Sequence, residues 1–277
     1  MTPLAVNGPL RRLTKRLLAG LPVNAYIRLR ALAAAWDIRT GAWSEPELAL
    51  IHYAVRPGET AIDVGANFGL WSYHLARAVG PTGRVYAFEP VPYTYAVLAT
   101  TLRVLGCRSV RALPFACGAT NGAVTLRVPM QSCGIPAAGQ TCDARRQDER
   151  PGRDQHARHR QSEEIPVVQI ALAGVLEDVE VSFVKADIEG AELFAFGGMT
   201  GIFAQHHPTV VCEINPWFLE GFGLDVHDLL GFFYERDYDV RRLVNGRLLP
   251  WCGRRVEEDN YVFIHPTRLD RFAECPR

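Results

Sequence analysis

Acidic side chains close four apolar segments of the chain, at points where strands are expected to end. These residues are Asp63, Glu89, Asp187 and Glu213. The carboxyl ends of parallel strands meet at one edge of a sheet, so the four carboxyl groups should converge there. Carboxylates in such a place can accept hydrogen bonds from a bound ligand or take a proton from a reacting hydroxyl group. What they do depends on the elements that position them.

The first two acids belong to a motif that binds an adenosine-containing cofactor. A short strand from Thr60 runs into a glycine-bracketed turn, Gly65–Gly69, and a helical segment, Leu70–Val79, follows. A second strand, Arg84–Phe88, leads to Glu89, which lies twenty residues (89 − 69) past Gly69. The glycines allow close approach of the backbone, and the helix N-terminus favours a negative group. We expect Glu89 to accept hydrogen bonds from both ribose hydroxyl groups.

The turn favours S-adenosylmethionine over a dinucleotide. A dinucleotide site requires G-x-G-x-x-G, and here only Gly65 fits, because Asn67 and Leu70 occupy the second and third positions. S-adenosylmethionine has no pyrophosphate, and its carboxylate and amine suit backbone N–H groups, a carboxylate and the Asn67 amide. A nicotinamide-linked oxidoreductase and a non-catalytic adenosine-binding regulatory protein are the alternatives. The expected cofactor-binding residues are Asp63, Gly65, Asn67, Phe68, Gly69 and Glu89, with Cys117 near the adenine.

Four motifs together resemble the FkbM-type methyltransferase family, in order and spacing, over roughly residues 45 to 265. They are Asp63–Gly69, Phe88–Pro90, Val184–Glu192 and Val211–Asn215, of which the Asp-Ile-Glu-Gly-x-Glu element is the most specific. The resemblance implies S-adenosylmethionine-dependent methylation of a hydroxyl group on a sugar, glycan or natural product. It also implies the class I methyltransferase strand order, with an antiparallel last strand.

Methyl transfer to a hydroxyl group requires a residue that takes the hydroxyl proton. Asp187 is our first candidate for this catalytic base and Glu213 is the second; the alternative for each is a hydrogen bond that only positions the cofactor or a turn. Glu189 and Glu192 begin a predicted helix and are expected to stabilise its dipole. Lys185 either pairs with one of the acids or is a buried structural cation.

A magnesium site is the less favoured interpretation of the same region. Asp187, Glu213 and Asn215 resemble the ligand set of metal-dependent catechol-type methyltransferases, and oxygen ligands suit Mg²⁺. An extra residue separates the second and third ligands, however, so we expect no metal ligands.

Strands that alternate with helices predict a doubly wound, Rossmann-like α/β fold with a mostly parallel sheet. We expect residues 1–50 to form an N-terminal helical segment and residues 51–277 to form the methyltransferase domain, with an insertion at about 130–165. Within it, Asp143–Glu164 is either a solvated loop or a lid over the acceptor. Further helices are expected at 45–55, 91–105, 191–196 and 227–236, further strands at 110–116, 123–128, 179–186, 208–213, 240–243 and 261–264, and hairpin turns at Asn121-Gly122 and Asn245-Gly246.

Composition and charge indicate which binding partners and which cellular location to expect. The formal net charge is +0, which gives no global attraction to nucleic acid. Seven cysteines form no C-x-x-C pair, and no run of 18 apolar residues occurs, so we expect a cytoplasmic protein without a zinc or disulfide framework. Basic residues dominate the N-terminal segment before Asp37. We favour an ordinary packed helix there over contact with a membrane surface.

Overall fold

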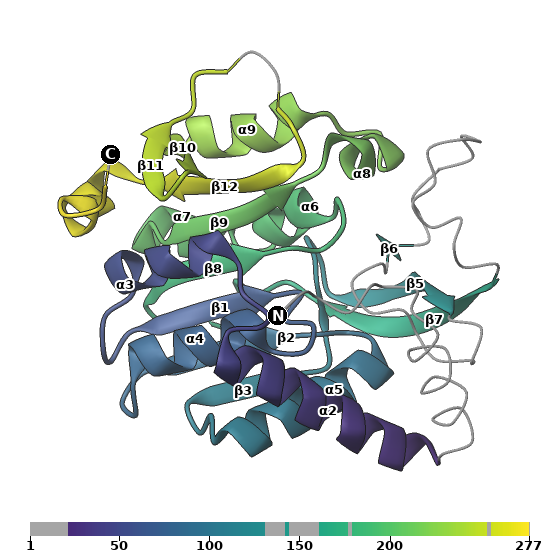
Figure 1. Cartoon of the computed structure of the whole chain (residues 1–277). Coiled ribbons are helices and arrows are strands. Elements are labelled where there is room, and N and C mark those ends of the chain that lie inside the picture. The colour runs from purple at the N-terminus through teal and green to yellow at the C-terminus, as the bar shows by residue number, and fades with distance from the viewer. Residues whose placement is uncertain (1–21, 131–141, 144–160, 177–178, 254–255, 277) are drawn as a thin grey trace.

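An eight-stranded sheet forms the centre of the molecule. The computed structural model describes residues 22–130, 142–143, 161–176, 179–253 and 256–276. The strands lie in the order β11-β10-β12-β9-β8-β1-β2-β3, and those from β9 to β3 run parallel while β12, β10 and β11 are antiparallel (Figure 1). Their bounds are β1 Thr60–Val64, β2 Arg84–Phe88, β3 Val110–Leu113, β8 Val181–Ala186, β9 Thr209–Ile214, β10 Asp239–Val244, β11 Arg247–Pro250 and β12 Asp259–Ile264. The predicted doubly wound fold with an antiparallel final strand is confirmed.

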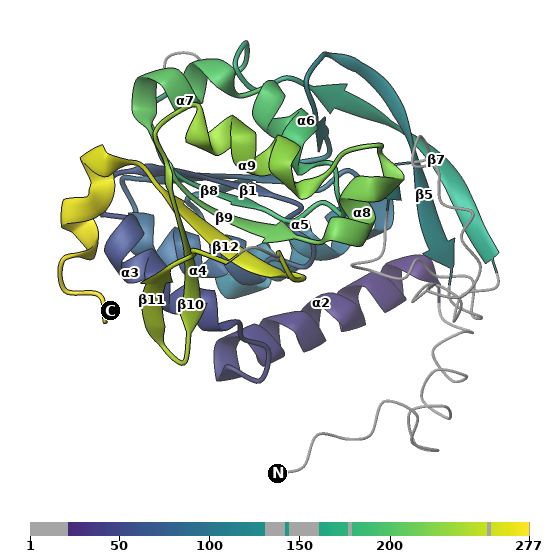
Figure 2. The same ribbon diagram turned by 90° about the horizontal axis from the view of Figure 1, so that it is seen from above.

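Helices cover both faces of this sheet (Figure 2). One face carries α6 (Glu192–Gly197), α7 (Thr200–His206) and α9 (Val226–Tyr234). The other carries α4 (Leu70–Val79) and α5 (Pro92–Leu105), with α2 (Val23–Thr40) as an outer helix packed on α5. The remaining helical segments are η1 (Pro46–Leu50), α3 (Ile51–Ala54), α8 (Pro216–Gly221) and η3 (Pro266–Phe272).

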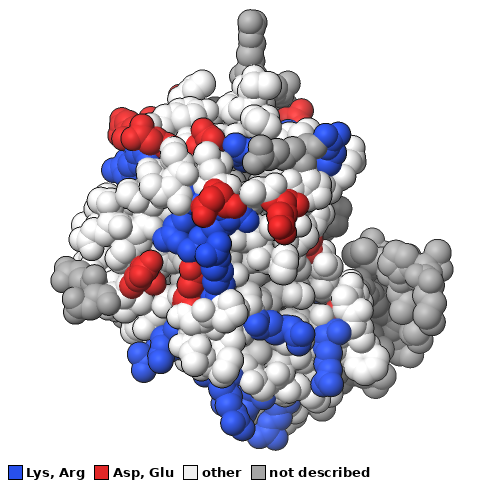
Figure 3. All heavy atoms as spheres, turned by 90° about the vertical axis from the view of Figure 1, so that its left-hand side faces the viewer, with Lys and Arg blue, Asp and Glu red and all other residues white. Residues whose placement is uncertain are grey.

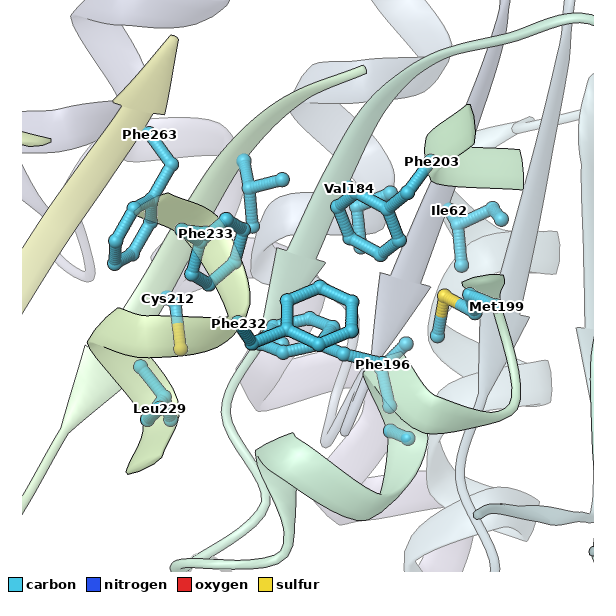
Figure 4. Close-up of a cluster of buried hydrophobic side chains, with 14 of the residues drawn as sticks. Ile62, Val184, Phe196, Met199, Phe203, Cys212, Leu229, Phe232, Phe233 and Phe263 are labelled. Atoms are coloured by element: carbon cyan, nitrogen blue, oxygen red, sulfur yellow. The ribbon is translucent and has the colours of Figure 1, made fainter. Parts of the chain in front are cut away.

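The hydrophobic core explains why the central strands are almost continuously apolar. Every residue of β8 is buried, as expected for a parallel strand covered on both faces. Aromatic side chains of α6, α7 and α9 pack against one face; Phe233 of α9, for example, stacks on Phe263 of β12 at 3.7 Å between ring centroids (Figure 4). Lys185 is the exception within β8, because its charged side chain is only 2% exposed.

A second sheet, in the order β4-β7-β5-β6, corrects two predictions. Its strands are β4 (Ala116–Cys117), β5 (Gly122–Met130), β6 (Cys142–Asp143) and β7 (Gln161–Ile170). The predicted hairpin at Asn121-Gly122, which would return beside the 110–116 strand, is wrong, since β5 pairs antiparallel with β7. Part of the predicted 143–164 loop is likewise strand, because residues 161–164 pair with β5. Both errors arise because the partner strands are far apart in sequence.

Other boundaries also differ from the sequence-based expectations. The predicted 45–55 helix is a 3₁₀ turn followed by one α turn. The Asn245-Gly246 turn joins β10 to an additional strand, β11, and not directly to β12. Helices α7 and α8 were not predicted. The lid hypothesis for residues 144–160 lies outside the described residues. In the part of the chain that the structure describes, no helix has the length and apolar character needed to cross a membrane.

Candidate active site

The four acidic residues lie on four adjacent strands. In the sheet order β9-β8-β1-β2, Glu213 lies in β9, Asp187 follows β8, Asp63 lies in β1 and Glu89 follows β2. All four strands are parallel and end at the same edge. The predicted convergence of these carboxyl groups is therefore confirmed, and the site has a Glu89 side and a Glu213 side.

Glu89 is held by the backbone on both sides of its carboxyl group. One oxygen accepts from the Asn67 N–H at 3.1 Å, and the other accepts from the Val91 N–H at 3.0 Å. The residue is 7% exposed, and burial raises its pKa to about 8 although the two backbone hydrogen bonds lower it. A carboxylate oxygen can accept more than one hydrogen bond, so each oxygen keeps capacity for a ligand hydroxyl group.

Asn67 provides the observation that fits a polar ligand at the turn. Its backbone has a φ of +48°, in the left-handed region that asparagine tolerates. Its side-chain oxygen Oδ1 is buried and has no hydrogen-bond partner among the residues that the structure describes. A buried acceptor without a donor costs free energy, so a donor group of a bound molecule would satisfy it. The amine of S-adenosylmethionine is such a donor.

The backbone N–H groups of the turn are directed differently from our expectation. Those of Gly65 and Ala66 donate to the Phe88 carbonyl oxygen at 3.0 and 2.9 Å, so they tie the turn to β2 and are not left for a ligand. Gly65 itself has a φ of +79°, and a Cβ atom there would lie 2.0 Å from the Asp187 carbonyl oxygen. A glycine is thus required at position 65 because any side chain there would clash with the loop after β8.

Phe68 and Gly69 complete the turn by packing. Phe68 is 4% exposed, and the Arg30 guanidinium of α2 lies 4.6 Å from its ring centroid. Gly69 has a φ of +98° and directly precedes α4, and a Cβ atom there would lie 3.1 Å from Leu98. These two residues therefore shape the turn and join it to α2 and α5.

Asp63 is enclosed by the protein. It is 1% exposed, and its Oδ2 atom accepts a hydrogen bond of 2.5 Å from the hydroxyl group of Ser72 in α4. Burial raises the pKa of Asp63 to about 6, although Ser72 and Lys185 lower it. The hydrogen bond joins the end of β1 to the first turn of α4, across the glycine turn.

The carboxyl groups of Asp187 and Glu213 lie close enough to share a hydrogen bond. Burial, this hydrogen bond and the Asp187 charge raise the pKa of Glu213 to about 9. Burial also acts to raise the pKa of Asp187, but the Lys185 ammonium group and the hydrogen bond from Glu213 outweigh it and hold that pKa below its usual range. The two carboxyl groups are thus shifted in opposite directions, and 39% of the Asp187 side chain is exposed.

Lys185 lies beneath this pair in a buried polar network. Its Nζ atom is 3.7 Å from Asp187 Oδ2, and it donates to Asn260 Oδ1 at 3.2 Å. The same ammonium group lies 5.4 Å from the centroid of the Trp71 ring. Asn260 in turn contacts Glu47 at 3.5 Å. Lys185 therefore both pairs with an acid and is a buried cation, so the two interpretations of the sequence are compatible.

Glu192 closes the loop that presents Asp187. Its carboxylate accepts from the backbone N–H groups of Ile188 at 2.9 Å and Gly190 at 3.3 Å. Burial raises its pKa to about 7. At Gly190, where φ is +95°, a Cβ atom would lie 2.6 Å from the Phe218 backbone. The loop is therefore fixed by a carboxylate from within and by α8 from outside, which goes beyond the expected stabilisation of the helix dipole.

Cys117 and Asn215 have identifiable structural surroundings. Cys117 is 7% exposed in β4, pairs with Ile170 of β7, and burial raises the pKa of its thiol. Asn215 caps α8, since its Oδ1 atom accepts from the Trp217 N–H at 3.1 Å. The side-chain oxygen considered as a magnesium ligand is thus used within the protein. Within the described residues, no cluster of three or more His, Cys, Asp or Glu side chains is arranged to hold a metal ion.

Sequence reasoning missed the residues that support the acids from a distance. Ser72 gives only a weak signal, as a polar residue inside an amphipathic helix. Glu47 and Asn260 give none, because they are 213 residues apart in the chain and meet only in the fold. The hydrogen bond from Trp71 Nε1 to Glu45 Oε2, 2.7 Å long, joins a helix to a preceding segment in the same way.

Comparison with known proteins identifies the family. The model of the FkbM methyltransferase domain matches residues 63–240, which is more than half of the chain and spans all four acids. A search among curated protein sequences finds no match.

Three solved structures are among those to which this chain is similar. Methyltransferase FkbM from Methylobacillus flagellatus KT has 17% sequence identity and a TM-score of 0.48, and the match covers 92% of this chain and 59% of that protein. The putative methyltransferase SMU.1697c from Streptococcus mutans, in complex with SAH, has 9% identity and a TM-score of 0.43, with 80% of this chain and 97% of that one covered. The O-methyltransferase TomG from Streptomyces achromogenes, in complex with SAM, has 12% identity and a TM-score of 0.44, with 85% and 89% covered. The chain thus spans about three fifths of the length of the Methylobacillus protein. The family match, together with the acids that meet at the end of a class I sheet, places this chain in the FkbM family of S-adenosylmethionine-dependent methyltransferases.

Proposed function

We propose that the protein is an O-methyltransferase that acts on a hydroxyl group of a sugar, a glycan or another natural product. The observation that carries this proposal is the position of Asp187, whose side chain is 39% exposed and whose Oδ2 atom lies 3.7 Å from the buried Lys185 Nζ atom, a cation that lowers the pKa of Asp187. An ionised, partly exposed carboxylate at the edge where class I sheets bind their ligands suits proton abstraction from a hydroxyl group. A site for a nucleophile that needs no base would not require such an arrangement.

The Glu89 side of the site is proposed to hold the cofactor. The carboxyl group of Glu89 would accept hydrogen bonds from the ribose hydroxyl groups, and Asn67 Oδ1 would accept one from the cofactor amine. Asp63 would act by fixing α4 through Ser72. Gly65, Phe68 and Gly69 would shape the turn, and Cys117 would contribute apolar surface near the adenine. When bound, S-adenosylmethionine supplies an electrophilic methyl group.

The Glu213 side is proposed to hold the acceptor. Asp187 would take the hydroxyl proton as the new carbon–oxygen bond forms, and the protonated Glu213 would orient Asp187 through their hydrogen bond. Positioning of two reactants can supply roughly 7–11 kcal/mol of the barrier reduction, and a general base adds about 10²–10⁴-fold. Trp217 lies in α8, directly after β9, where an aromatic face can pack on a sugar ring.

The test is methyl transfer by the full chain to a panel of small hydroxylated acceptors, followed by mass spectrometry. We expect a gain of one methyl group on oxygen in at least one sugar or natural-product acceptor, and loss of that gain in Asp187→Asn. Calorimetry is run in parallel with S-adenosylmethionine and NAD. Binding of NAD alone would contradict the proposal, as would methylation only of nitrogen or carbon atoms.

A further inference from the structure

A cavity at the opposite edge of the sheet has no role in the proposed chemistry. It has a volume of about 620 Å³, within the usual range for sites that bind small molecules. It lies where the parallel strands begin, between the ends of α2, α4 and α5, and its walls include Tyr73, Ser109 and three arginines, Arg39, Arg77 and Arg108. No acidic side chain lines it. The cavity is therefore strongly basic.

The three arginines are not neutralised within the described part of the chain. All three are exposed, and no carboxylate there forms an ion pair with any of them. Arg77 donates a hydrogen bond of 3.4 Å to the Tyr73 hydroxyl oxygen. Arg39 and Arg77 lie in the last turns of α2 and α4, where a cation favours the helix dipole, but Arg108 lies in a turn. Figure 3, which views this edge, shows Lys and Arg without Asp or Glu across its lower part. Three guanidinium groups around a cavity suit phosphate.

An exposed apolar stripe on α2 leads to this cavity. Leu29, Leu32 and Trp36 are 46%, 52% and 69% exposed, and their spacing of three and four residues places them on one side of the helix. The opposite side packs inward, since Ala31, Ala34, Ala35 and Ile38 are buried. Arg39 follows three residues after Trp36 on the same side, so the stripe continues into the cavity wall. In Figure 2, α2 lies on the outside of the molecule.

We propose that the outer side of α2 and the basic cavity together form a docking surface for a membrane that contains anionic phospholipids. Leu, Trp and flanking Arg side chains are the composition of helices that lie in the interface of a bilayer. The stripe would enter the boundary between headgroups and acyl chains, and Arg39, Arg77 and Arg108 would bind phosphate groups of the headgroups. A protein partner would be expected to offer acidic side chains in place of phosphate, and a second copy would place like charges together. The surface is distinct from the methyl-transfer site.

The experiment is co-sedimentation of the full chain with vesicles of phosphatidylcholine, either alone or mixed with phosphatidylglycerol. We expect sedimentation with the mixed vesicles, and weakening of that binding by added salt. Changing all three arginines to glutamine should reduce the affinity by more than about fiftyfold, at about fivefold for each charge near the surface. Trp36→Ser should reduce it by about tenfold, since the aromatic side chain no longer enters the interface.

Two matched variants control for general loss of charge or exposed surface. Tyr234→Ser removes an aromatic residue that is 51% exposed on α9, across the sheet, and Arg247→Gln removes an exposed arginine on β11. Both should bind vesicles as the unchanged protein does. The proposal would be overturned if vesicle binding fell equally in these controls or stayed unchanged in Trp36→Ser. It would also be overturned if sedimentation did not depend on phosphatidylglycerol. A dimer in size-exclusion chromatography that Trp36→Ser converts to a monomer would also overturn it, because α2 would then be an interface between copies.

Discussion

The two sides of the candidate site use the same side-chain chemistry in opposite ways. On the Glu89 side, where we propose that the cofactor binds, Glu89 and Asp63 are 7% and 1% exposed and are held by backbone N–H groups and a serine hydroxyl group. On the Glu213 side, where we propose that the acceptor binds, Asp187 and Glu213 are partly exposed and lie next to the buried Lys185. Burial raises the pKa of three of the four; Asp187 alone is shifted below its usual range.

In the proposed function, this difference would separate cofactor binding from proton transfer. A buried carboxyl group that accepts fixed hydrogen bonds is suited to hold a ligand, because it cannot move and has little access to solvent. A base must be ionised and must reach the reacting hydroxyl group. In the proposed function, Lys185, whose Nζ atom lies 3.7 Å from Asp187, would keep this residue ionised. Variants on the two sides should therefore affect different measurements.

The largest expected effect is on the rate, from Asp187→Asn. The amide keeps the shape but cannot take a proton, so kcat for the acceptor found in the panel should fall by about 10²–10⁴-fold. The dissociation constant of S-adenosylmethionine, measured by calorimetry, should change little. Glu220→Gln on α8, which removes an exposed acid, is the control and should keep its rate. A normal rate in Asp187→Asn would exclude the residue as the base.

Glu89→Gln should show the reverse pattern. Above pH 8, where Glu89 is ionised, hydrogen bonds to its charged group contribute about 1.5–3 kcal/mol each, so the affinity for S-adenosylmethionine should fall at least about tenfold there. At saturating cofactor, kcat should stay within a few fold of the unchanged enzyme. Calorimetry and initial rates measure the two quantities. Undiminished affinity would mean that Glu89 does not hold the ribose.

Gly65→Ala tests the close contact between the glycine turn and the loop that carries Asp187. The new Cβ atom would meet the Asp187 carbonyl oxygen, whereas Gly223, which has a similar φ of +73°, has no atom within 4 Å of an added Cβ. Overpacking costs about 1–3 kcal/mol, so the free energy of unfolding should fall by that much more in Gly65→Ala than in Gly223→Ala. Denaturant titration gives both values. Equal losses would show that only backbone conformation matters at Gly65.

The pKa of Glu89 predicts a pH dependence confined to the cofactor side. Burial raises this pKa to about 8, and the ionised form is the better acceptor for two hydroxyl groups. Below pH 8, binding must release a proton, so affinity should rise with pH by up to about tenfold per unit and become constant above pH 8. Calorimetry over this range, in buffers of different ionisation enthalpy, detects the proton. A flat profile would contradict the assignment, and Glu89→Gln should give one.

The smallest expected effect is a displacement of the acid limb of kcat/KM. Lys185 and the hydrogen bond from Glu213 both hold the pKa of Asp187 down. Removing either raises that pKa, so activity should be lost at a higher pH than in the unchanged enzyme. Lys185→Met should move the limb further than Glu213→Ala, because the charge of Lys185 is the larger influence. The pH profiles of both variants measure this, and a shift toward lower pH would refute the proposed role of Lys185.

Local sequence patterns predicted most of the sheet that carries the site. The 70–79 helix and the 84–88 strand match α4 and β2, because apolar spacing and flanking glycines define both within a few residues. The hairpin expected beside the 110–116 strand was wrong, since β5 pairs with β7 some forty residues later. A turn signal indicates that the chain reverses, but it does not say which strand it joins.

The sequence by itself determined that four acids end parallel strands and that a glycine turn lies beside the first of them. These features depend on neighbours in the chain and on the common direction of parallel strands. Only the tertiary structure decided how deeply each acid is buried and which charges lie near it. The order of the strands places Asp187 next to Glu213, and packing buries Lys185 against Asn260, which comes from a distant strand. Protonation depends on burial and on the distance between charges, and both are properties of the folded chain.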